Sequence, residues 1–197
     1  MIEARGAAGA AREHIEALAA LATEVASGMG AQVAELAALV EATLRGGGKL
    51  LFCGNGGSAA EAQHLAAEYV VRFARERAPL AALALTTDAS VLTASANDCG
   101  FESVFERQVL ALGRRGDLLI LLSTSGESDN LIRAAEAARS AGLSTAALLA
   151  KGGGRLKARV DLALVLPTAV TARAQEMHLA VGHVVCELVE RSFLERT

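Results

Sequence analysis

KLLFCGNGGSA, residues 49–59, is the stretch of sequence that decides the fold. Four apolar residues, 50–53, run directly into a glycine-rich turn, and the residues after the turn have the spacing of a helix. A buried strand that leads through glycines into a helix is typical of parallel α/β sheets, where the turn lies at the carboxyl end of the strand. Ligands bind at that end, so the same stretch also indicates where to look for a site.

Short apolar runs recur along the rest of the chain. After the first strand near 49–53, we expect further strands near 80–85, 117–122, 144–149 and 161–166. The segments between them are amphipathic and long enough for helices, and the last segment, 171–195, predicts a long, largely apolar helix. Strands that alternate with helices predict an α/β fold, a doubly wound five-stranded parallel sheet flanked by helices.

The segment before the first strand is helical in pattern. Apolar residues share a helical face on both sides of the Met29-Gly30 break, and the pattern ends at glycines 46–48. We expect residues 1–47 to form an N-terminal helical hairpin that covers a sheet edge or packs against a second copy of the chain. The 197 residues then form one domain, 1–197, with the parallel core and the C-terminal helix at 48–197.

Composition excludes several classes of protein. The net charge is −3 and the 19 basic residues are spread along the chain, which argues against a nucleic-acid surface. No apolar run reaches the roughly 18 residues that a membrane span needs, and the N-terminus lacks the pattern of a signal peptide. The three cysteines are far apart and odd in number, as expected in a reducing compartment. We therefore expect a cytoplasmic protein with no membrane partner.

The glycine loop, residues 54–59, allows more than one interpretation. Its letters satisfy G-x-G-x-x-A, a dinucleotide fingerprint, but that pattern needs an acidic residue at the end of the next strand. The next strand ends in Leu85-Thr86-Thr87, with Asp88 beyond it, so support for a nicotinamide cofactor is weak. A purely structural glycine turn is the other alternative.

A second loop, STSGES at residues 123–128, follows the predicted strand 117–122 and precedes a helix. Its four hydroxyls and the amides at the helix start can bind a phosphate without a lysine or an arginine. Helix capping by Ser128 or Asp129 would explain one hydroxyl but not four. Because no G-x-x-x-x-G-K-[ST] loop is present, the sequence favours a compact monophosphate over a nucleotide.

Two helices carry residues that could bind a metal. His64 and Glu68 are four residues apart and share a helical face, as zinc ligands can, although such a pair is often only a surface hydrogen bond. In the apolar last helix stand four polar residues, Gln175, Glu176, His178 and His183. Buried polar groups need partners, and a histidine whose partners lie within the core is as good an interpretation as a ligand. Gln175 and His183 are about 12 Å apart along a regular helix, near the limit for sharing one ion.

Four motifs, in order along the chain, resemble the phosphoheptose isomerase family within the sugar-isomerase (SIS) fold: GNGGSAAEAQH at 54–64, ALTTDASVLTASANDCGFE at 84–102, LLSTSGESDN at 121–130 and QEMHLAVGH at 175–183. The resemblance implies an aldose-ketose isomerase that converts sedoheptulose 7-phosphate to D-glycero-D-manno-heptose 7-phosphate, a heptose precursor of lipopolysaccharide or another surface polysaccharide. It also implies a homotetramer with active sites between subunits and one zinc ion per subunit.

The resemblance assigns roles by position. The implied zinc ligands are His64, Glu68, Gln175 and His183, of which Glu68 and His183 are also the acid/base pair. The implied substrate contacts are Asn55, Gly56, Gly57, Glu68, Asn97, Asp98, Ser123, Thr124, Ser125, Ser128 and Gln175, with Arg72 a further contact one turn beyond Glu68.

The sequence departs from the family pattern at two places. Cys99 stands where the family commonly has an aromatic residue, and Glu127-Ser128-Asp129 stands where Asn-Ser-Pro is usual, which adds negative charge beside the phosphate loop. The rival interpretation is a non-enzymatic SIS regulator of the replication-initiator-associating type, in which the final histidine is replaced and the serine loop carries a bulky basic residue. This chain has His183 and Ser125 at those positions. A sugar-phosphate sensor or an isomerase of another phosphosugar stays open as well.

Overall fold

Five parallel strands form the centre of the protein. The computed structural model describes residues 4–195 and contains β1 (Leu50–Gly54), β2 (Ala82–Ala84), β3 (Leu118–Ser123), β4 (Ser144–Leu149) and β5 (Leu162–Val165). Their order across the sheet is β2-β1-β3-β4-β5, so the chain winds from β1 to one side and then to the other. The predicted doubly wound parallel sheet is confirmed, with each strand within a few residues of its predicted place.

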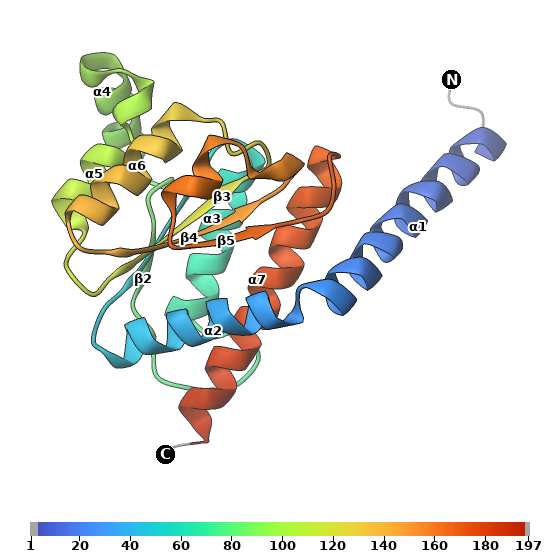
Figure 1. Cartoon of the computed structure of the whole chain (residues 1–197), viewed down its shortest axis with the longest axis horizontal. Coiled ribbons are helices and arrows are strands. Elements are labelled where there is room, and N and C mark those ends of the chain that lie inside the picture. The colour runs from blue at the N-terminus through green and yellow to red at the C-terminus, as the bar shows by residue number, and fades with distance from the viewer. Residues whose placement is uncertain (1–3, 196–197) are drawn as a thin grey trace.

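Helices cover both faces of the sheet (Figure 1). One face packs against α2 (Gly30–Arg45), α3 (Gly57–Val70) and α7 (Thr171–Leu194), and the other against α4 (Ala89–Cys99), α5 (Glu106–Leu112) and α6 (Asp129–Ser140). Within residues 4–195 the chain also forms three short 3-10 turns, η1 (Phe101–Ser103), η2 (Lys151–Gly153) and η3 (Arg155–Arg159). Along β1, Leu50 and Phe52 enter the first core while Leu51 and Cys53 enter the second, as the alternation of a strand requires.

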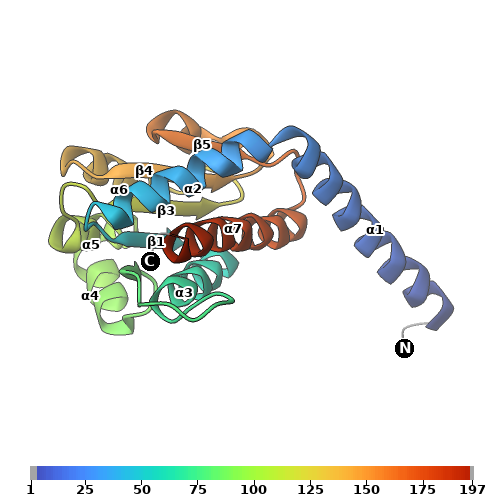
Figure 2. The same ribbon diagram turned by 90° about the horizontal axis from the view of Figure 1, so that it is seen from below.

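The predicted N-terminal hairpin is wrong. Helix α1 (Ala4–Gly28) does not fold back on α2 but extends away from the sheet, as Figures 1 and 2 show. Only Met29 separates the two helices, and its N–H and C=O keep helical hydrogen bonds, 2.9 Å to Val25 O and 3.0 Å from Val33 N. A helical hairpin needs a loop of about 2–5 residues, so this junction can bend but cannot reverse the chain.

The last helix is long, as predicted, but one part of its surface is open. Val184 and Leu188 are substantially exposed and line an apolar groove between α7, α1 and α2. Arg173 ties α1 to α7, because its guanidinium donates to His14 O at 2.6 Å. Among the described helices, none has both the length and the apolar character of a membrane span.

A buried carboxylate joins the amino-terminal ends of β1 and β3. Asp117 accepts hydrogen bonds from Lys49 N at 2.9 Å and Arg114 N at 2.8 Å, and it pairs with the Lys49 ammonium. Burial alone would raise the pKa of Asp117, but the hydrogen bonds from Lys49 and Arg114 outweigh it and hold that pKa below its ordinary value.

Replacing Asp117 with asparagine is therefore expected to destabilise the protein by about 1.5–3 kcal/mol at pH 7. The folded carboxyl has a lowered pKa, so its contribution is complete above the unfolded pKa of about 3.9 and is lost as the pH falls through the folded pKa. Urea unfolding of both proteins at pH 7 and at acid pH measures the difference in free energy. A difference that stays constant down to pH 3 would contradict this account.

Candidate active site

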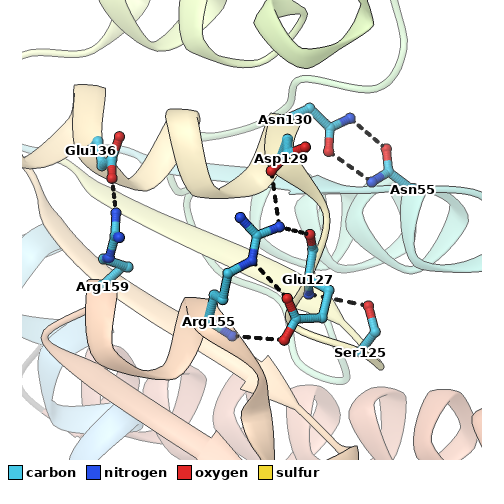
Figure 3. A network of polar contacts seen from close by, with 8 residues as sticks. All are labelled: Asn55, Ser125, Glu127, Asp129, Asn130, Glu136, Arg155 and Arg159. Atoms are coloured by element: carbon cyan, nitrogen blue, oxygen red, sulfur yellow. Dashed lines mark hydrogen bonds and ion pairs between the residues drawn. The ribbon is translucent and has the colours of Figure 1, made fainter.

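The glycine loop and the serine loop lie side by side at the carboxyl ends of β1 and β3. The amides of Asn55 and Asn130 bond reciprocally across the gap, at 2.9 Å and 2.8 Å (Figure 3). Gly57 opens α3, and a Cβ there would lie 2.3 Å from Gln175 Nε2, so the glycine leaves room for the Gln175 side chain in this position. Two loops and the first turn of α7 therefore meet at one place.

A polar pocket of about 180 Å³, called the serine pocket below, lies between the two loops and the start of α7. Its polar lining is Asn55, Ser58, Ser123, Thr124, Ser125, Ser128, Thr171 and Gln175. Ser123 Oγ accepts from Gly126 N at 2.9 Å and Ser125 Oγ accepts from Glu127 N at 3.2 Å, so these hydroxyls shape the loop. Ser128 occupies the N-cap position of α6 without a capping bond from its side chain. Its hydroxyl is therefore not used for capping, and the first amides of α6 lie beside it, as in anion sites at helix starts.

Three residues of this region were missed by the sequence reasoning. Ser58 and Thr171 line the pocket, and Asn130 holds the two loops together. Thr171 opens the last helix, and a polar residue at a helix start beside a ligand site is a signal that could have been used. Asn130 has no such signal, because its partner is 75 positions away in the sequence.

The second cluster lies farther along the same two helices. His64 and Glu68 of α3 face His183 of α7, with His64 Nε2 2.7 Å from His183 Nε2 and 3.5 Å from Glu68 Oε1. One potential ligand atom from each residue lies within 4.8 Å of the others. Two imidazoles and a carboxylate are a donor set that zinc takes, so the residues present fit such an ion.

The electrostatics favour an uncharged His183. Burial lowers the pKa of His183, the nearby charge of His64 lowers it further, and Glu68 opposes the shift. The ring of Phe73 contributes to that burial, with its centroid 5.4 Å from the imidazole. A neutral imidazole is the form that can accept a proton or bind a metal.

Of the four polar residues of the last helix, two line the candidate sites and two have partners elsewhere. Gln175 lines the serine pocket and His183 joins the cluster, two turns farther along α7. Glu176 instead pairs with Arg173 at 2.7 Å. His178 is fully buried, with Nδ1 3.7 Å from the buried Glu61 carboxylate, so the interpretation as a core histidine applies to His178 and not to His183.

Other predicted residues lie apart from both clusters. Asn97 donates to Asp98 at 2.7 Å on α4, and Asp98 lines a separate pocket of about 620 Å³ together with Cys99 and Arg107. Arg72 lies just beyond α3 and pairs with Glu76 at 3.9 Å. The carboxylate of Asp88 accepts from Val91 N at 3.0 Å and caps α4, so it serves the helix and not a ribose.

Comparison with known proteins agrees with the motifs. The SIS domain family model matches residues 13–150. The phosphoheptose isomerase of Roseiflexus sp. (strain RS-1) is 56% identical over 163 residues, which cover 83% of this chain and 83% of that protein. Among solved structures, the phosphoheptose isomerase of Neisseria gonorrhoeae aligns with a TM-score of 0.88 at 40% identity, over 93% of this chain and 98% of that one. The Francisella tularensis phosphoheptose isomerase aligns at 0.91 and 34% identity, over 94% and 98%.

The resemblance to the family that the four motifs indicated is thereby confirmed over most of the chain, and the structure shares its fold with these two proteins over 93–94% of its length. Both the sequence identity and the mutual coverage are high, so the match is not confined to one motif or to a shared sheet. The chain belongs to the phosphoheptose isomerase family of SIS-domain proteins.

Proposed function

We propose that the protein interconverts sedoheptulose 7-phosphate and D-glycero-D-manno-heptose 7-phosphate, in the cytoplasm, for surface polysaccharide synthesis. The observation that carries the proposal is the placement of two different sites along one pair of helices. The serine pocket lies at the start of α3 and α7, and the His64, Glu68 and His183 cluster lies farther along both. A seven-carbon sugar phosphate carries its reacting carbonyl and its phosphate at opposite ends and needs such a separation.

The spacing of the two sites follows from helix geometry. Ser58 and His64 are six residues apart on α3, about 9 Å along the axis, and Gln175 and His183 are about 12 Å apart on α7. The phosphate would bind the hydroxyls and amides of residues 123–128, which places the other end of the sugar toward the cluster. The pocket then sets the orientation, and the cluster supplies the chemistry.

The reaction moves a proton between neighbouring carbons. A base removes the proton alpha to the carbonyl, an acid protonates the adjacent oxygen, and an enediolate forms between the two steps. Glu68 and His183 would exchange these protons, because the neutral imidazole can accept one and the carboxylate lies in the same cluster. Gln175, at the end of the pocket, would hold a sugar oxygen.

We further propose that one zinc ion per chain binds His64, Glu68 and His183. Gln175 would be the fourth ligand only with its side chain turned from the pocket toward the cluster. Bound zinc would polarise the sugar oxygens as a Lewis acid. A carboxylate held by a cation is a weaker base, so Glu68 cannot be bound tightly and act as the base at the same moment. Metal binding and turnover therefore need separate measurements.

We also propose that the protein is a homotetramer with sites between subunits. The open apolar groove of α1, α2 and α7 supports self-association, because exposed Val184 and Leu188 are the kind of surface that a partner copy covers. In such an assembly Asn97 and Asp98, which lie outside the serine pocket of their own chain, would come from a neighbouring subunit or from a rearrangement of α4.

The direct test is turnover of sedoheptulose 7-phosphate by the purified protein, followed by proton NMR. Appearance of the anomeric signals of the aldose is the expected result. A folded, zinc-loaded protein that binds the sugar phosphate but gives no aldose would contradict the isomerase function. That result would favour a non-enzymatic SIS regulator or a sugar-phosphate sensor.

Zinc binding is expected to appear without any assay of activity. Protein stripped with a chelator should take up about one zinc per chain and gain thermal stability, by about 2.7 kcal/mol when the free ion is at 100 times its dissociation constant. His64→Gln should lose most of this gain, whereas His14→Gln, a histidine outside the cluster, should keep it. Equal stabilisation of all three proteins would contradict the assigned ligands.

A further inference from the structure

Glu127 and Asp129, the two acidic residues that depart from the family pattern beside the serine loop, both pair with one arginine. Arg155 of η3 donates from Nε to Glu127 Oε2 at 2.7 Å and from Nη2 to Asp129 Oδ1 at 2.9 Å (Figure 3). The same guanidinium reaches Glu127 O at 2.6 Å, and the backbone N–H of Arg155 donates to Glu127 Oε1 at 3.1 Å. The carboxylates that depart from the family pattern are therefore held in a network, which the sequence alone does not reveal.

The backbone beside this network is in direct contact with the serine loop. Gly126 has φ +67°, and a Cβ there would lie 2.0 Å from Gly153 O, so the two segments touch main chain to main chain. Leu156 N donates to Gly126 O at 2.9 Å. The Ser125–Ser128 turn, whose hydroxyls line the pocket, is thus fixed from behind by residues 153–156.

The charges of Glu127, Asp129 and Arg155 affect one another. The Arg155 side-chain hydrogen bond lowers the pKa of Glu127, partly offset by burial and by the charge of Asp129. The hydrogen bonds that Arg155 donates to Glu127 and then to Asp129 raise the pKa of Arg155. The formal charges of Glu127, Asp129 and Arg155 sum to −1 beside the pocket. Without Arg155 the same place would carry −2, facing the phosphate that residues 123–128 would bind.

We propose that Arg155 is a positioning residue for the phosphate site: it offsets the charge of Glu127 and Asp129 and holds their turn in the shape that accepts a phosphate. The proposal rests on the phosphate-binding role given to residues 123–128 above. Arg155 acts through the two carboxylates and is not itself a phosphate ligand, since it does not line the pocket and its Nε and Nη2 are engaged by Glu127 and Asp129.

The chain contains a matched control for this arginine. Arg159 lies four residues farther along η3 and pairs with Glu136 of α6, the helix that also carries Asp129 (Figure 3). Both arginines are about half exposed and both join η3 to α6. Only Arg155 contacts the turn that forms the pocket. The loss of an exposed ion pair would affect Arg155→Ala and Arg159→Ala alike, whereas an effect on the pocket would appear in Arg155→Ala alone.

Arg155→Ala is expected to raise KM for sedoheptulose 7-phosphate about tenfold and to weaken inorganic phosphate binding by a similar factor, as expected when a unit charge near a bound anion is removed. The kcat should change less than twofold, because the cluster on α3 and α7 is untouched. Arg159→Ala should leave both constants unchanged. Thermal unfolding should hardly differ between the two, since exposed ion pairs contribute little to stability.

A double-mutant cycle tests the route through the carboxylates. In a Glu127→Gln/Asp129→Asn background, Arg155→Ala should raise KM and the phosphate dissociation constant less than threefold, because no excess charge is left to offset. An equal penalty in both backgrounds, or equal constants for Arg155→Ala and Arg159→Ala, would overturn the proposal. If the wild type binds phosphate but does not turn over the sugar, only the isomerase function is refuted. The role of Arg155 is then tested by the inorganic phosphate dissociation constants of the wild type, Arg155→Ala and Arg159→Ala.

Discussion

Replacing Glu68 with glutamine is expected to lower kcat for heptose phosphate isomerisation by about 10²–10⁴-fold, the contribution of a positioned acid or base. Glutamine has the same shape and keeps the packing of α3, but it cannot accept a proton from carbon. Glu68 lies 3.5 Å from His64 and in one cluster with the neutral His183, and its side chain is only 19% exposed. No other carboxylate among the described residues belongs to that cluster.

Two measurements separate loss of chemistry from loss of binding. The steady-state kcat from NMR gives the rate, and deuterium uptake from D₂O into the sugar reports proton transfer. For Glu68→Gln both should fall while KM stays near the wild-type value. The control is Glu187→Gln, an exposed carboxylate on α7 that pairs with Arg191 and is not part of the cluster. A kcat within tenfold of the wild type for folded Glu68→Gln would remove Glu68 from the acid/base pair.

The fold was predictable because its signals are local. Each strand is a short apolar run, and the glycine turn after β1 marks the carboxyl edge of the sheet without reference to any distant residue. The hairpin at 1–47 was predicted wrongly because a break in helical pattern does not say whether the chain reverses. That depends on the hydrogen bonds of the single residue Met29, which the pattern does not specify.

The site was predictable only where motifs carry it. His64, Glu68 and His183 come together as expected, since helical spacing and the family motif point the same way. Asn130 and Arg155 were invisible because their roles depend on pairings 75 and 28 residues apart, respectively. The sequence predicted two uncompensated negative charges at Glu127 and Asp129. The structure places the positive charge of Arg155 against both, which lowers the net negative charge beside the serine loop.

The largest loss of stability is expected at Glu190, near the end of α7. This carboxylate is only 2% exposed and accepts three backbone N–H groups, from Phe73 at 3.0 Å, Ala74 at 3.0 Å and Arg75 at 2.9 Å. It also lies 3.4 Å from Arg77 Nε, whose side chain is 5% exposed. One acidic group thus holds the loop after α3 and neutralises a buried arginine.

Glu190→Ala should therefore destabilise the protein by about 3–5 kcal/mol, because it leaves a buried cation and three amides without their acceptor. That is a large share of the roughly 5–15 kcal/mol by which a native domain is stable. Urea unfolding followed by circular dichroism gives the free energy. Glu187→Ala, one turn earlier on the same helix, removes an exposed ion pair and should cost no more than about 1 kcal/mol.

The same contacts link this stability to the active site. Arg77 donates to the backbone carbonyls of Glu68 at 2.7 Å and Tyr69 at 2.9 Å, and the loop that Glu190 holds places Phe73 against His183. Glu190→Gln keeps an acceptor of the same shape but removes the charge, so it should fold and yet lose part of the order around residues 68–77. We expect its kcat to fall while Glu187→Gln stays at the wild-type value. A Glu190→Gln protein with wild-type stability and kcat would show that the charge on Glu190 supports neither the loop nor the position of Glu68.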